Sequence, residues 1–221
     1  MARKKIEIGK LKPVLEKLKE QLSIEDWILI ALYSSPKKSY PSEIYIQKFL
    51  FLAQKYLKNI DIEFQPYRLG PYSPSVKDSI DILISENSIK KDPSGELKLS
   101  QKGLKKAENR FLQCSDKERE LLSELGRFIY NMSEDELLLY TYIVHGYKEK
   151  SDIINKLLQR RIPIAISLVR KNLVSISLAA KIAGMSLQEF IKFLKKKGIK
   201  PYIAEVEDID KASSLGSSTY L

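Results

Sequence analysis

Residues 176–197 carry the pattern that most constrains the fold of this chain. Ala180 is followed four residues later by Gly184 and a further six residues later by Phe190. In a helix-turn-helix, a small residue in the first helix lets the second helix cross closely, and a glycine in the turn adopts a positive φ. An apolar residue of the second helix then fills the space between the two. The spacing therefore predicts two short helices joined by a tight turn at Gly184.

The second helix of this pattern is expected to begin after Ser186, which can form a capping box with Glu189. Glutamine near the start of such a helix can bind adenine bidentately, and lysines can contact phosphates. The alternative is an ordinary helical hairpin with a solvated lysine face. The candidate DNA-binding residues of this helix are Ser186, Leu187, Gln188, Lys192, Lys195 and Lys196.

Positive charge is concentrated in the same part of the chain. The 221 residues carry a formal net charge of +10, and residues 151–200 hold eleven basic residues against two acids, Asp152 and Glu189. Residues 114–150, in contrast, hold more acidic than basic residues. A basic surface favours polyanionic partners through phosphate contacts and the release of counterions. Double-stranded DNA is therefore the expected partner.

The C-terminal segment also resembles a small uncharacterised prokaryotic helix-turn-helix family whose members are often described as antitoxins. The likeness runs from about Ile162 to Asp210 and covers about a quarter of the chain. It implies a DNA-binding regulator, or the antitoxin of a toxin–antitoxin pair. The motifs that carry it are Ala179-Ala180, Ala183-Gly184-Met185-Ser186, Glu189-Phe190 and Gly198-Ile199.

The N-terminal part has the pattern of several helices interrupted by one β-hairpin. Ile89-Lys90-Lys91 and Leu97-Lys98-Leu99 flank a turn sequence that contains Pro93 and Gly95, which predicts the hairpin. Apolar periodicity and capping residues predict the other elements. These are helices over residues 11–22, 23–33, 41–57 and 73–87, helices that begin at Ser100, Ser115, Ser133 and Ser151, and a short strand over residues 62–65.

This order is typical of a winged helix, and two resemblances point the same way. The aromatic loop, the hairpin and the helix start at Ser100 resemble PadR-like winged-helix regulators. Residues 24–156 also resemble an uncharacterised prokaryotic winged-helix family that is distantly similar to the SocA/Panacea antitoxin domains. The segments that carry this second likeness are residues 47–52, 66–73 and 135–142.

The expected fold is thus mainly α and has two domains. Residues 1–158 form a winged helix with one hairpin and a helical extension, and residues 159–221 form a small helix-turn-helix domain. The helix over residues 73–87 is acidic, so the first domain is expected to contact protein and to hold a homodimer together. Only its wing, with Lys90, Lys91 and Lys98, is expected near DNA.

Catalytic and metal chemistry are not expected. Cys114 and His145 are the only residues of their kinds and lie far apart in sequence, and no glycine-rich phosphate loop occurs. We therefore expect no enzymatic activity, no metal and no cofactor. No apolar stretch is long enough for a membrane helix and the N-terminus lacks a secretory pattern, so a cytoplasmic protein is expected. The alternative function is a protein-interaction module that binds a toxin or another protein without reading DNA.

Overall fold

A computed structural model describes residues 22–146 and 152–199 of the chain. The chain divides into two compact units, residues 1–155 (unit 1) and residues 156–221 (unit 2). The described residues form ten helices and three short strands, so the fold is mainly helical, as the sequence predicts. None of these helices is long and apolar enough to cross a lipid bilayer. The helix expected over residues 11–22 lies outside the described residues except for Leu22.

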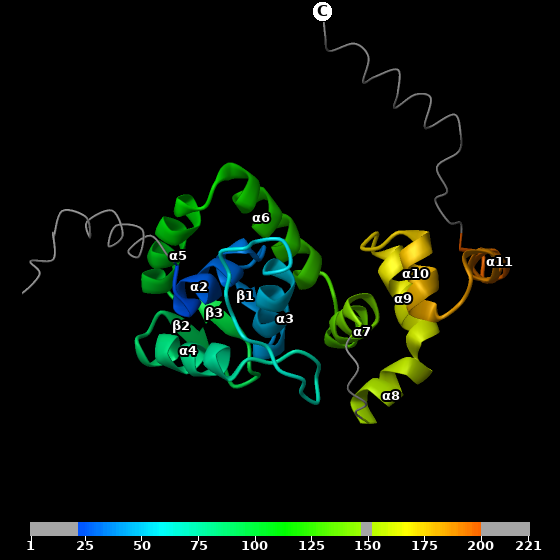
Figure 1. Cartoon of the computed structure of the whole chain (residues 1–221), viewed down its shortest axis with the longest axis horizontal. Helices are drawn as coiled ribbons and strands as arrows, with labels where there is room; N and C mark the ends of the chain where they lie inside the picture. Colours follow the sequence, from blue (N-terminus) through cyan, green and yellow to red (C-terminus); the bar gives the residue numbers. More distant parts are fainter. Residues whose placement is uncertain (1–21, 147–151, 200–221) are drawn as a thin grey trace, which may run out of the picture. The chain divides into compact units, whose positions relative to one another are not determined.

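Helix α2 (Ile24–Ser34) forms the centre of unit 1. It begins with a capping box, in which Asp26 N donates to Ser23 Oγ and Ser23 N donates to Asp26 Oδ2, both at 3.2 Å. Every residue from Trp27 to Leu32 is at most 2% exposed. A helix that is apolar on all sides needs neighbours on all sides. Four helices supply them: α3 (Glu43–Ala53), α4 (Pro74–Ser85), α5 (Gln101–Gln113) and α6 (Asp116–Tyr130) (Figure 1).

A three-stranded antiparallel sheet closes one side of unit 1. β2 (Ile89–Lys91) and β3 (Leu97–Leu99) form the expected hairpin, and β1 (Ser39–Tyr40) pairs with β3, so the strand order is β1-β3-β2. Leu97 and Leu99 point into the core while Lys98 between them is exposed. This alternation places one face of the hairpin on the apolar core and leaves the other to solvent. The two-residue strand β1 was not expected from the sequence.

The prediction of a strand over residues 62–65 is wrong. Ile62 is buried and Glu63 exposed, so the alternation is real, but the described segment contributes only an isolated bridge between Gln65 and Tyr72. A strand needs a neighbour to receive its backbone hydrogen bonds, and here the chain turns back on itself after one pair. The loop is fixed instead by Gln47, whose side chain donates to Ser73 O and accepts from Ser73 N, both at 3.0 Å.

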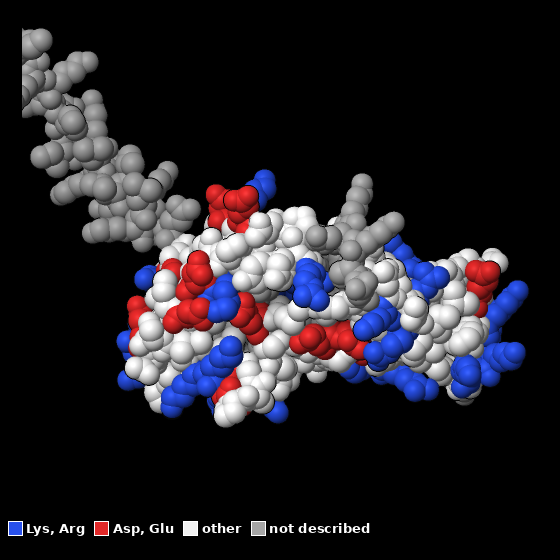
Figure 2. Space-filling model, turned by 90° about the horizontal axis from the view of Figure 1, so that it is seen from below, with Lys and Arg blue, Asp and Glu red and all other residues white. Residues whose placement is uncertain are grey.

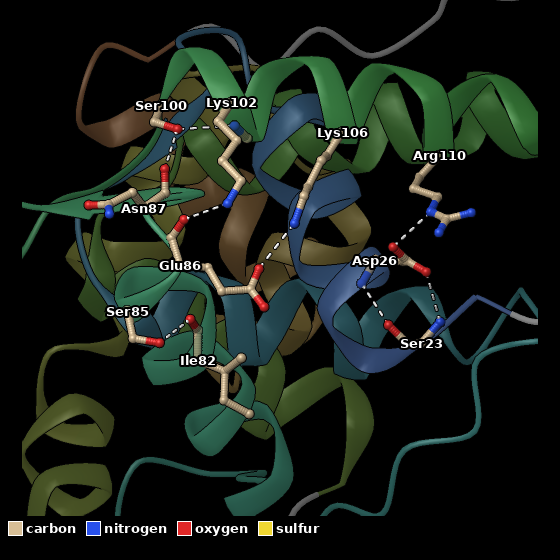
Figure 3. Close-up of polar contacts among 11 residues, drawn as sticks. Ser23, Asp26, Ile82, Ser85, Glu86, Asn87, Ser100, Lys102, Lys106 and Arg110 are labelled. Carbon is tan, nitrogen blue, oxygen red and sulfur yellow. Dashed lines mark hydrogen bonds and ion pairs between the residues drawn. The ribbon is translucent and has the colours of Figure 1, made fainter.

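Basic residues on one face of α5 bind its neighbours. Lys102 Nζ donates to the carbonyl oxygen of Glu86 at 2.8 Å, Lys106 Nζ lies 3.0 Å from the Glu86 carboxylate, and Arg110 Nε lies 2.9 Å from Asp26 Oδ1 (Figure 3). The three residues are four positions apart, so they share one helix face. They join α5 to the end of α4 and to the start of α2. Their positive charges therefore stabilise the packing of unit 1.

The helices at the end of unit 1 begin as the sequence predicts. Ser115 opens α6 and Ser133 opens α7 (Glu134–His145), each with a capping box to Glu118 or Glu136. Leu137 and Leu139 of α7 are fully buried. The units divide between Asn155 and Lys156, within α8 (Asp152–Gln159). The sequence had placed the boundary near Gln159, at the end of the same helix. Unit 2 continues with α9 (Arg161–Arg170), α10 (Ile176–Ala183) and α11 (Leu187–Lys196).

The junction of the hairpin with α5 depends on a close approach at Gly103. A Cβ at Gly103 would lie 1.9 Å from Ser88 O, and that carbonyl oxygen already accepts from Ser100 N at 3.0 Å. We expect Gly103→Ala to destabilise unit 1 by about 1–3 kcal/mol, because overpacking forces the backbone apart. Urea unfolding followed by the fluorescence of Trp27, the single tryptophan, measures this change.

The control is Lys105→Ala, at an exposed position on the same helix. It should change the unfolding free energy by less than about 0.5 kcal/mol. Equal stability of the two variants would contradict the close approach of Ser88 to α5.

Candidate nucleic-acid interface

Gly184 forms the turn between α10 and α11 in the backbone conformation that the sequence predicts. Its φ of 65° and ψ of 37° lie in the left-handed region, which side chains other than glycine adopt at a cost. The next helix begins two residues later, at Ser186 as its N-cap. The helix-turn-helix spacing read from Ala180, Gly184 and Phe190 therefore corresponds to two short helices with a left-handed turn between them.

The start of α11 is fixed by a complete capping box. Glu189 N donates to Ser186 Oγ at 3.3 Å, while the Glu189 carboxylate accepts from Ser186 N at 2.9 Å and from Ser186 Oγ at 2.7 Å. These hydrogen bonds hold the pKa of the Glu189 carboxyl below its usual value, and the nearby Lys192 lowers the pKa further. Glu189 therefore stays ionised at the helix N-terminus, where the helix dipole favours a negative charge.

The inner face of the two helices is apolar and packed. Ala180 is 2% exposed and Phe190 and Leu194 are fully buried. α9 packs against α10 and contributes Ile164, Ala165 and Leu168 to this small core. The small side chains of α10 allow the close approach that the sequence predicted for Ala180.

The outer face of α11 presents the residues that the sequence predicts as DNA-binding. All six are exposed, and Leu187 is 46% exposed. Gln188, Lys192 and Lys195 are four and three positions apart, so they lie on one face of the helix. This exposed set is Ser186, Leu187, Gln188, Lys192, Lys195 and Lys196.

The described part of unit 2 is strongly basic. Residues 156–199 contain ten basic residues and a single acid, Glu189, which caps α11. On the face drawn in Figure 2, Lys and Arg side chains predominate over unit 2. A surface with this charge attracts phosphates, and the attraction weakens as salt is added.

Arg161 is a residue of this surface that sequence reasoning missed. A Cβ at Gly184 would lie 2.3 Å from Arg161 Cζ, so the guanidinium of α9 lies directly against the turn. The two residues are far apart in sequence and no local spacing connects them. The positive charge beside the turn therefore comes from a packing contact between helices.

The β2–β3 hairpin and α4 of unit 1 carry different charges. Lys90, Lys91 and Lys98 are exposed on the hairpin, as expected. On α4, Asp78 and Asp81 are exposed, and Asp81 forms an ion pair with Lys77. A phosphate backbone would be repelled by this helix, whereas the exposed lysines of the hairpin would attract it.

Cys114 and His145 lie in different surroundings. Burial raises the pKa of the Cys114 thiol to about 11, with Glu118 adding to the shift, so the thiol is protonated at neutral pH. The His145 ring packs edge-on against Phe51 and Tyr140, with centroids 5.8 and 6.1 Å apart. Cys114 is thus a buried thiol, and His145 is packed against aromatic rings.

Comparisons with known proteins address only the C-terminal part. Residues 143–213, about a third of the chain, match the model of an Uncharacterised protein family (UPF0175). The likeness of this segment to an uncharacterised family is thereby confirmed, and the family's description gives no function. Searches of curated proteins and of solved structures found no match. The resemblance of the N-terminal part to winged-helix families stays a prediction.

The left-handed turn gives a direct test of this local structure. We expect Gly184→Val to destabilise unit 2 by more than about 1 kcal/mol, because a β-branched residue is strained at positive φ. The new side chain would also displace the Arg161 guanidinium. Amide hydrogen exchange of α10 and α11 measures the loss.

Two controls separate this strain from general damage. Gln188→Val introduces the same side chain at an exposed position of α11 and should cost only about 0.5 kcal/mol in helix propensity. The urea transition reported by Trp27 in unit 1 should not move. If Gly184→Val exchanges no faster than Gln188→Val, the turn does not depend on a left-handed residue.

Proposed function

We propose that this protein is a DNA-binding transcriptional regulator, of the kind that includes antitoxins, and that α11 is its recognition helix. The observation that carries the proposal is the outer face of α11, where Gln188, Lys192 and Lys195 are exposed together. A recognition helix enters the major groove with its N-terminal residues at the base edges. Gln188 is in the first turn and can pair with adenine, while the lysines further along reach phosphates.

The distribution of acids supports the same function. The only carboxylate in residues 156–199 is engaged by Ser186 at the helix start. Glu189 lies near Lys192, but the basic side chains of α11 form no ion pair among the described residues. Those of α5, in contrast, contact Glu86 and Asp26. Arg161 beside the turn adds a cation at the N-terminal end of α11, where backbone N–H groups also favour an anion.

For unit 1 we propose a winged helix that mainly contacts protein. Its element order, α2-β1-α3-α4-β2-β3, and its sheet order, β1-β3-β2, are compatible with that fold. In this interpretation α4 has the position of a recognition helix, but its exposed acids disfavour DNA. Ile82 on the same helix is 46% exposed, which suits contact with protein. We propose that this unit holds a homodimer, because one recognition helix alone makes few base contacts.

The phosphate contacts can be tested by salt dependence. We expect Lys192→Ala and Lys195→Ala each to weaken binding to random-sequence double-stranded DNA. Each should also lower the slope of log Kobs against log salt by about one unit, because one counterion fewer is released. Fluorescence anisotropy of the full chain at several salt concentrations measures both quantities.

Lys58→Ala is the matched control, since Lys58 is exposed and lies in unit 1 away from the hairpin. Its affinity and salt slope should equal those of the unchanged protein. If the two α11 variants behave like Lys58→Ala, these lysines face solvent only, and the alternative of a protein-binding module for a toxin or another partner is favoured.

A further inference from the structure

Unit 1 contains a cavity that the proposed DNA-binding function does not use. It has a volume of about 300 Å³ and lies between α3, the loop that precedes α4, and the hairpin. Small-molecule sites in proteins begin at about this size. Its lining includes Glu43, Gln47, Lys48, Tyr67, Tyr72 and Lys91.

Lys48 is the unusual member of this lining. Lysines are almost never fully buried unless paired, yet Lys48 is only 2% exposed. Among the described residues, its Nζ has a single hydrogen-bond acceptor, Pro71 O at 2.8 Å. A protonated amine has three donors, so two N–H groups remain for another partner.

Burial without an ion pair changes the acidity of this amine. Desolvation lowers the pKa of Lys48 to about 7, and the negative charge of Glu134 on α7 opposes the shift only in part. The amine is therefore poised to take up a proton near neutral pH. An anion beside Nζ would stabilise the charged form.

Among the polar groups of the cavity, Lys48 is the one best placed to bind a ligand. Both ends of the Gln47 amide are engaged by Ser73, so this side chain has little left to offer a ligand. Lys91 is a second cation and is exposed. Burial raises the pKa of the Glu43 carboxyl, although Lys77, Gln47 and Lys91 oppose the shift. The rings of Tyr67 and Tyr72 pack with centroids 5.0 Å apart and supply apolar surface.

We propose that this cavity binds a small, largely apolar carboxylate, whose two oxygens accept the free N–H groups of Lys48 Nζ. Two remaining donors match one carboxylate, whereas a phosphate group would need more donors than Lys48 and the engaged Gln47 provide. The aromatic rings and the aliphatic lining suit an apolar body. The ligand offsets the cost of burying the amine, since a buried charge is stable only when it is paired.

The test uses the full-length protein and two simple probes, benzoate and hexanoate, with benzamide and hexanamide as neutral matches of the same shape. Saturation-transfer NMR measures binding, and titration gives the affinities. We expect each carboxylate to bind at least about tenfold more tightly than its amide, because only the anion pairs with the amine. Above pH 7 the affinity should fall by up to about tenfold per pH unit, because the ligand then requires uptake of a proton by Lys48.

Lys48→Met should abolish the preference for the carboxylates while keeping the fold. Methionine has a similar length and stays apolar, but it removes the hydrogen bond to Pro71 O, so we expect a modest fall in melting temperature. Lys58→Met, at an exposed site, should bind the probes like the unchanged protein. If folded Lys48→Met still bound the carboxylates more tightly than the amides, the proposal would be overturned.

Two results with the unchanged protein would also overturn it. The first is equal affinity for each carboxylate and its amide. The second is no detectable binding of either carboxylate at about 10 mM, well above the millimolar Kd of a weak fragment.

Discussion

The hydrogen bonds between Ser186 and Glu189 determine how α11 begins, and the proposed DNA-binding face depends on them. They begin α11 directly after the left-handed turn at Gly184 and so fix the direction in which this helix leaves α10. They also hold the only carboxylate of residues 156–199 at the helix start. The remaining exposed side chains of α11 are neutral or positive, so Glu189 at the helix start is the single acid of this helix.

Net charge alone would not identify that face. Unit 1 also has a helix with regularly spaced basic residues, α5, but Lys102, Lys106 and Arg110 bind the end of α4 and the start of α2 (Figure 3). These side chains serve the packing of unit 1. In α11 the lysines have no such partner among the described residues, apart from the electrostatic effect of Lys192 on Glu189. Whether a basic side chain is paired within the protein or remains exposed to a ligand therefore depends on the tertiary fold.

The sequence predicted the features that depend on neighbouring residues. The caps at Ser23, Ser115, Ser133 and Ser186 are local hydrogen bonds within four residues, and the hairpin follows from alternation around a turn. The features it missed depend on contacts between distant segments. Strand β1 has only two residues, and the alternation at residues 62–65 found no partner strand.

The candidate site shows the same division. The exposed residues of α11 follow from helical periodicity, because each is three or four positions from another. Arg161 reaches the turn only through packing of α9 on α10. The burial of Lys48 was likewise unpredictable, since nothing in the sequence of α3 distinguishes it from a solvated lysine.

The central claim is that α11 is the surface that meets DNA. Amide chemical-shift mapping of the full-length protein with a random-sequence duplex tests it most directly. We predict the largest shifts in the turn at Gly184 and along Leu187–Lys196. Added salt should reverse these shifts, because the proposed contacts are with phosphates. Shifts confined to unit 1, or no shifts at low salt, would contradict it.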